Sequence, residues 1–203
     1  MVDTVEESVA ALEEDLGLPK AFLDSLKNED DWSFIIKLHA LVEAAVSHLL
    51  VHKFGDERLL SIFSRVELSN KATGKIAFIS AMELVNKHER RFIRSLSELR
   101  NKLVHNIGNV QFDLATYADN LEKDAKDNFA KSFWYGYGEQ DDGVDRKQLV
   151  LAKPKEAIWV SALLFLAIIY ELKEAERLRS KANAMAVEVA RYVSKLRGSS
   201  TGL

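Results

Sequence analysis

Residues 89–106 read ERRFIRSLSELRNKLVHN, and the spacing of their apolar side chains predicts one amphipathic helix. Phe92, Leu96 and Leu103 share one face of that helix. At roughly 100° per residue, Arg100 falls inside the same apolar arc, about 40° from Leu96. Because a guanidinium keeps its charge, an arginine aimed at the core needs a carboxylate, a phosphate or a lined cavity beside it.

Asn101 and His105 lie one helical turn apart on the adjoining face, and with Arg100 they suit metal-independent cleavage of RNA. His105 could take the proton of a ribose 2′-hydroxyl or give one to the leaving 5′-oxygen. Arg100 could hold the scissile phosphate, and Asn101 could orient the phosphate or the imidazole. One histidine of this kind per chain favours a homodimer that presents two copies. The alternative is structural: Arg100 closes a buried ion pair and His105 ends its helix.

A second long helix is predicted over 31–54, ending at Gly55, with an apolar arc so wide that other elements must cover most of its sides. His39 and Glu43 both fall inside that arc. We interpret His39 as a core histidine with a hydrogen-bond partner. Glu43 needs a cationic or donor partner, and we expect it to face Arg100 across the core.

The sequence as a whole predicts an all-α multi-helix bundle with 31–54 and 89–105 as antiparallel central helices. We expect a helical arm over 1–30, one helical domain over 31–197 and a disordered tail over 198–203. Other expected features are helices at 4–16, 19–27, 56–66, 75–86 and 113–131, an extended stretch at 110–112, and helices over 155–196 with a break near 180–184.

Composition narrows the function classes. The chain has 203 residues, a net charge of −3 and no cysteine, which excludes disulfides, thiolate metal sites and cysteine nucleophiles. No overall basic field attracts nucleic acid, so any RNA contact must be local. The acidic N-terminus lacks the pattern of a signal peptide, and the longest apolar run, 158–170, is too short for a bilayer and suits a core helix. We expect a cytoplasmic protein without membrane contact.

The helix predicted over 89–106 carries local positive charge that could guide a polynucleotide backbone, at Arg90, Arg91, Arg94 and Lys102. A solvated helix face is the alternative. The aromatic residues of 133–137, in an expected loop, could stack on bases, or could anchor the fold or a dimer contact.

Other chemistries find little support. His48, His52 and Asp56 have the spacing of metal ligands along one helix face, but they lack the H-E-x-x-H pattern, and we predict neither a metal nor a cofactor. Glycine-rich phosphate loops, a G-x-S-x-G serine motif and a convincing helix-turn-helix are not found.

Residues 97–105, SELRNKLVH, at the end of a helix and after an apolar helix that carries Glu43, resemble the HEPN superfamily. Its mark is an arginine, a polar residue that is often asparagine, and then a histidine four to six positions after the arginine. The resemblance implies an all-helical domain in which Arg100, Asn101 and His105 occupy the motif positions. Many members are dimeric metal-independent ribonucleases, frequently in toxin–antitoxin or antiviral systems, and others are binding modules without catalysis.

Within that superfamily, residues 31–115 resemble the mannitol operon repressor family. The similarity lies in the layout of 33–54 with LVEAAV at 41–46, then GKI at 74–76, VN at 85–86 and QFD at 111–113. That family is regarded as transcriptional regulators. The resemblances therefore imply two functions: an endoribonuclease with its site in a dimer groove, or a non-catalytic regulator that contacts a regulatory or antitoxin protein. A purely structural dimer module is the third alternative.

Overall fold

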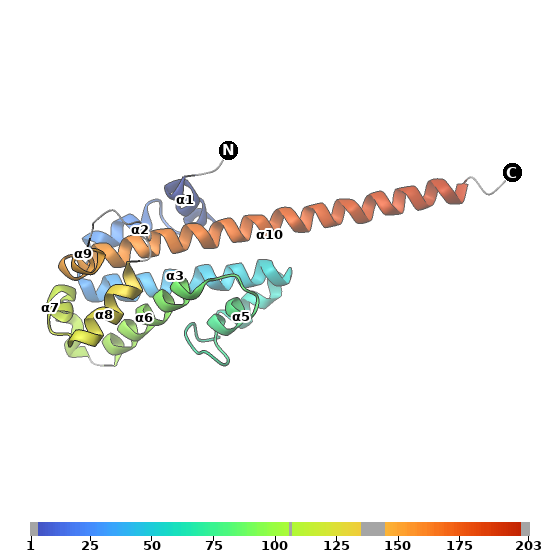
Figure 1. Cartoon of the computed structure of the whole chain (residues 1–203). Coiled ribbons are helices and arrows are strands. Elements are labelled where there is room, and N and C mark those ends of the chain that lie inside the picture. Colours follow the sequence, from blue (N-terminus) through green and yellow to red (C-terminus); the bar gives the residue numbers. More distant parts are fainter. Residues whose placement is uncertain (1–3, 106, 135–144, 200–203) are drawn as a thin grey trace.

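The described part of the chain, residues 4–105, 107–134 and 145–199 of a computed structural model, consists of helices and contains no strand, which confirms the all-α prediction (Figure 1). The α-helices are α1 (Val5–Asp15), α2 (Phe22–Ser25), α3 (Asp31–Phe54), α4 (Leu60–Phe63), α5 (Lys75–Ala81), α6 (Lys87–Val104), α7 (Leu114–Asp119), α8 (Lys123–Phe133), α9 (Arg146–Ala152) and α10 (Pro154–Ser199). Three short 3-10 helices are η1 (Leu26–Asn28), η2 (Glu57–Leu59) and η3 (Ile107–Gln111).

Helix α3 is the centre of the bundle and has the predicted bounds. It begins because the Asp30 side chain accepts a hydrogen bond from the backbone N–H of Ser33, and it ends at Gly55, which has a φ of 68°. By length and composition α3 would also suit a membrane span, but 67% of its apolar window is buried inside the fold. The neighbouring helices thus account for its wide apolar surface.

Helices α6 and α10 both pack along α3, and α6 runs antiparallel to α3 as predicted (Figure 1). Asn86 starts α6 through a capping box, in which its side chain accepts from the N–H of Glu89 and the Glu89 carboxylate accepts from the N–H of Asn86. Phe92 and Leu96 are fully buried against the core. The amphipathic pattern of the sequence therefore places α6 correctly.

Helix α10 differs from the prediction because it continues through 180–184 without a break and includes Gly198 and Ser199. Its first half contains the apolar run 158–170, which is packed into the core as predicted. Its second half projects beyond the bundle (Figure 1). Residues 180–184 carry no proline or glycine, so the backbone has no local reason to break.

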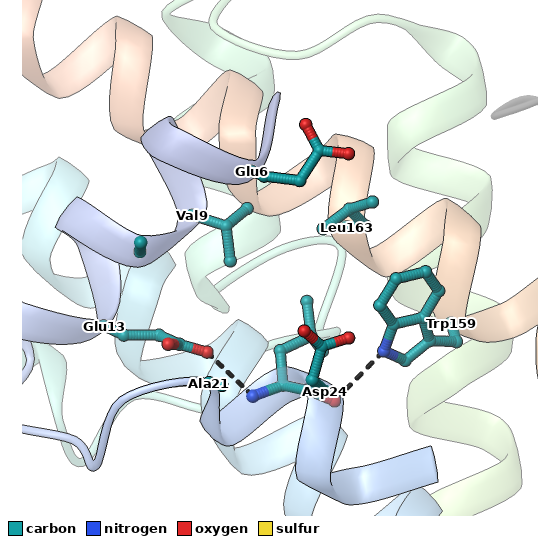
Figure 2. Close-up of a pocket in the computed structure, with 9 residues that line it drawn as sticks. Glu6, Val9, Glu13, Ala21, Asp24, Trp159 and Leu163 are labelled. Atoms are coloured by element: carbon teal, nitrogen blue, oxygen red, sulfur yellow. Dashed lines mark hydrogen bonds between the residues drawn. The ribbon is translucent and has the colours of Figure 1, made fainter. Parts of the chain in front are cut away.

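The N-terminal segment covers the α10 side of the bundle, with Leu12 and Leu23 buried. Figure 2 shows how it is held beside a cavity of 260 Å³: the backbone N–H of Leu23 donates to the buried Glu13 carboxylate over 2.7 Å, and Trp159 Nε1 donates to the Leu23 carbonyl over 3.0 Å. Lys27 Nζ lies 3.9 Å from the centre of the Trp159 ring. These contacts make the segment a cap on the core.

Several shorter predictions were wrong in detail. The stretch 110–112 is not extended, because residues through Gln111 belong to η3. The helix predicted over 75–86 ends at Ala81, where the chain turns through Glu83 with a φ of 54°. The predicted helices 56–66 and 113–131 are each divided into two pieces, η2 with α4 and α7 with α8. Side-chain caps at Asp56 and Asp113 start both pairs; η2 passes directly into α4, which ends at Phe63, and a turn at 120–122 separates α7 from α8.

Candidate functional site

A polar cavity of 340 Å³ lies between α3, α6 and the loop that follows α4. Arg100, Asn101 and His105, which the sequence singled out, all line it. The other lining residues are His39 and Glu43 of α3, Ser97 of α6, and the loop residues Ser64, Arg65, Val66, Glu67, Leu68 and Ser69. The structure thus brings the three predicted site residues together in one cavity.

Helix α6 supplies one wall of this cavity. Ser97, Asn101 and His105 are each one helical turn apart, and Arg100 lies beside Asn101 on the same wall. Arg100 is half-buried and lines the cavity instead of entering the apolar core. Its Nη1 donates to Asn101 Oδ1 over 3.0 Å. His105 is the exposed residue directly after the last turn of α6. Of the three environments expected for Arg100, the structure provides the lined cavity.

His39 forms the floor of the cavity as a buried, hydrogen-bonded histidine, as predicted. Its side chain is 6% exposed, and its Nε2 lies 3.1 Å from Ser97 Oγ. Burial lowers the pKa of His39 to about 4, and the charges of Arg100 and Lys75 act in the same direction while Glu43 opposes them. At neutral pH His39 is therefore uncharged, and it holds Ser97 in place.

Glu43 and Arg100 line the same cavity, but among the described residues no ion pair joins them. Among the described residues, the cation within ion-pair distance of Glu43 is Lys75, whose Nζ lies 2.8 Å from Glu43 Oε1. The Lys75 side chain is 0% exposed and that of Glu43 is 30% exposed, so the lysine lies behind the cavity and the carboxylate faces it. The one sequence signal for Lys75 was its position one turn before Ile79, on the apolar face of a predicted helix.

The loop opposite α6 is held by backbone hydrogen bonds that return to it from the start of α5. The N–H groups of Lys75 and Ile76 donate to the carbonyls of Glu67 and Leu68, over 2.9 Å and 3.0 Å. Gly74 is required here, because a Cβ atom would lie 2.6 Å from the carbonyl oxygen of Asn70. The loop is thus a fixed wall that presents Arg65 and Glu67 to the solvent.

Most charged side chains of the cavity are balanced by a charge of opposite sign, and Arg100 on α6 is the exception. Glu43 is neutralised by Lys75, and the exposed Arg65 and Glu67 have opposite signs. Arg100 remains as the cation in the cavity, beside the amide of Asn101 and the imidazole of His105. A guanidinium, an amide and an imidazole can together bind an anion and move a proton next to it.

The four predicted nucleic-acid contacts are not gathered at this cavity. Arg90 Nη1 donates to the Val85 carbonyl over 2.8 Å, and Arg94 Nε donates to the Arg90 carbonyl over 3.2 Å. Arg91 is exposed. Lys102 lies over the Tyr117 ring, 4.4 Å from its centre, where both residues line a different cavity. On a helix, Lys102 points away from Arg100, so the basic residues near Arg100 in sequence do not form one patch with it.

Two other sequence hypotheses receive no support. Within the described ranges, no group of three or more histidine, aspartate or glutamate side chains is placed to hold a metal ion, and His48, His52 and Asp56 form none. Phe133 does not belong to a loop: it ends α8, is fully buried and packs against Phe92 with ring centres 6.0 Å apart. Trp134, the residue directly after α8, is half-buried and packs against the core, and residues 135–137 lie outside the described residues.

The fold and cavity define the chain as an all-α bundle with a polar cavity against its central helix. Searches of family models, curated proteins and solved structures found no match to it.

Proposed function

We propose that this chain acts on RNA as a metal-independent endoribonuclease of the HEPN type, with the cavity between α3 and α6 as its active site. The observation that carries the proposal is the convergence of Arg100, Asn101 and His105 on one wall of a polar cavity. The HEPN resemblance of residues 97–105 supports the same assignment. Cleavage of this kind uses the 2′-hydroxyl of the substrate itself as the nucleophile.

In the proposed step the 2′-oxygen forms a bond to phosphorus and the bond from phosphorus to the 5′-oxygen breaks. His105 accepts the proton of the 2′-hydroxyl, for which its exposed position at the cavity rim is suited. Arg100 binds the non-bridging phosphate oxygens and stabilises the added negative charge. Asn101 accepts a hydrogen bond from Arg100 and so fixes the plane of the guanidinium.

The leaving 5′-oxygen needs a proton donor. His39 is unsuited to this role because it is 6% exposed and its pKa of about 4 leaves it uncharged at neutral pH. The proposal therefore includes a homodimer in which His105 of a second copy faces the same groove and donates that proton.

The test is an incubation of the full chain with end-labelled single-stranded and structured RNA in the presence of EDTA. Cleavage should persist in EDTA, leave a cyclic phosphate, and fall at least about 100-fold in His105→Ala and Arg100→Gln. His88→Ala, in the first turn of the same helix and outside the cavity lining, and Arg58→Gln, whose side chain is 89% exposed, are the matched controls and should cleave normally. RNA left intact at high protein concentration, or activity unchanged in His105→Ala, would refute the proposal.

A non-catalytic regulator that works through protein contacts is the second candidate, in keeping with the resemblance to the mannitol operon repressor family. The observation that favours it is the projecting half of α10, whose apolar side chains are exposed and available to a partner. Under this alternative, His105→Ala retains regulatory activity in cells and no variant cleaves RNA.

A further inference from the structure

The second half of α10 carries an apolar face that no other described residue covers. Every residue from 177 to 192 is exposed, and Figure 1 shows this part of the helix extending beyond the bundle. Leu178 is 61% exposed, Met185 66% and Tyr192 64%. Large apolar side chains are seldom so exposed in a row on one helix unless another surface covers them.

These side chains follow a heptad pattern. Ala175, Leu178, Ala182, Met185, Val189 and Tyr192 are separated by alternating steps of three and four residues. This is the spacing of the two core positions of a coiled coil, in which a second helix covers the seam. We call these six residues the α10 seam.

The α10 seam continues into an apolar groove on the bundle. The same spacing leads back to Ile168 and Leu164, which together with Val5 of α1 line a groove of 550 Å³. Glu171 interrupts the apolar line, and its carboxylate accepts a hydrogen bond of 2.6 Å from Ser8 Oγ. The surface that needs a partner therefore extends from the groove beside α1 along the projecting helix.

We propose that the partner is a second copy of this chain, whose α10 seam packs antiparallel against the first around a two-fold axis. In the register centred between Asn183 and Ala184, each small residue meets a large one: Ala175 lies opposite Tyr192 of the other copy, and Ala182 lies opposite Met185. A parallel pair would instead stack alanine on alanine and tyrosine on tyrosine.

Charged residues beside the α10 seam also favour the antiparallel pairing. In the antiparallel register, Lys181 of each copy lies opposite Glu188 of the other, which makes two symmetric ion pairs. In a parallel pair the flanking position opposite Lys181 is Ala186, and no ion pair forms. The overlap from 175 to 192 covers about 27 Å of helix at 1.5 Å per residue, and the helix then continues to Ser199 toward the groove at Ile168 of the other copy.

This pairing is independent of the proposed ribonuclease site. The residues that line the cavity come from α3, α6 and the loop after α4, and none of them belongs to α10. The two bundles stand at opposite ends of the paired helices, so both cavities stay open to solvent. The groove in which two His105 side chains meet for cleavage is a second interface, which the proposed function requires only while RNA is bound.

The first experiment measures the mass of the full chain in solution by light scattering and sedimentation over a range of concentrations. In the absence of RNA the wild-type chain should be a dimer, and Met185→Glu should raise the dissociation constant at least 100-fold. The matched control is Val187→Glu, which places the same charge on an apolar residue that is 51% exposed but lies off the seam, and it should remain a dimer. Circular dichroism checks that both variants keep the helical content of the wild type.

The second experiment tests direction and uses the absence of cysteine from the chain. Under oxidising conditions Ala175→Cys alone and Tyr192→Cys alone should stay uncrosslinked, while an equimolar mixture of the two should give a disulfide-linked dimer. A wild-type monomer at every concentration, a Met185→Glu dimer as stable as the wild type, or a crosslink in Ala175→Cys alone would each overturn the proposal. Loss of RNA cleavage in His105→Ala would have no effect on these outcomes.

Discussion

Replacing Glu43 with glutamine should destabilise the fold, because the buried ammonium of Lys75 depends on its carboxylate. The substitution keeps the size of the side chain and removes its charge, which leaves the ammonium of Lys75 at 0% exposure without its counter-charge. Removal of one partner from a buried pair costs about 3–5 kcal/mol. Since the Glu43 side chain is 30% exposed and water reaches it from the cavity, we expect the lower end, about 3 kcal/mol.

Replacement of the partner residue, Lys75, should destabilise the fold less. Lys75→Met removes the buried ammonium, keeps an apolar chain of similar length, and leaves the Glu43 carboxylate facing the water of the cavity, at a cost of about 1 kcal/mol. The double variant Glu43→Gln with Lys75→Met should then be more stable than Glu43→Gln alone. Free energies of unfolding from denaturant titrations at pH 7, followed by circular dichroism, give all four corners of this double-mutant cycle.

A matched control is available in the pair of Glu29 and Lys37. The Glu29 side chain is 32% exposed, close to Glu43, but Lys37 is 45% exposed where Lys75 is fully buried. Glu29→Gln should therefore cost less than about 1 kcal/mol. The reasoning fails if Glu43→Gln costs no more than Glu29→Gln, or if the effects of Glu43→Gln and Lys75→Met simply add.

Two further predictions concern the cavity floor and its loop. The wild-type free energy of unfolding should fall by about 2 kcal/mol between pH 7 and pH 5, because an unfolded histidine with a pKa of 6.5 binds a proton there while folded His39, with a pKa of about 4, does not. His39→Gln should reduce that loss, and equal losses of unfolding free energy in the wild type and His39→Gln, from urea titrations at the two pH values, would contradict this assignment. Gly74→Ala should lower stability by about 1–3 kcal/mol, because its Cβ would meet backbone atoms of Asn70 and Glu67 at 2.6–2.7 Å. A melting temperature equal to that of the wild type would contradict this prediction, because the loop would then have moved without loss of stability.

The long helices could be predicted because their signals are local. Asp30 and Gly55 bound α3, and the capping box of Asn86 with Glu89 starts α6. The apolar spacing of each helix states which face is buried, whatever covers it. The prediction of a break in α10 was wrong because it rested on the length of the segment alone, and no residue in 180–184 interrupts a helix.

The site could be predicted only where it lies on one helix. Arg100, Asn101 and His105 share a side of α6 through the helical repeat, so their meeting in one cavity follows from sequence spacing. The Glu43 partner could not be found this way, because Lys75 is 32 residues away along the chain and reaches α3 through the turn at Gly74. Lys102 shows the opposite error. It was grouped with Arg100 because the two are close in sequence, but it lies on a different side of α6 and lines another cavity.

The sequence by itself determined the all-α class, the two central helices and the set of polar groups that α6 presents. These follow from caps and periodicity, which act over a few residues. Only the tertiary structure decided which groups meet across the bundle: that Lys75 neutralises Glu43, that His39 is buried against Ser97, and that half of α10 stands outside the core. The physical reason is that burial and ion pairing depend on which distant segments pack together, and a local pattern states only that a partner is needed.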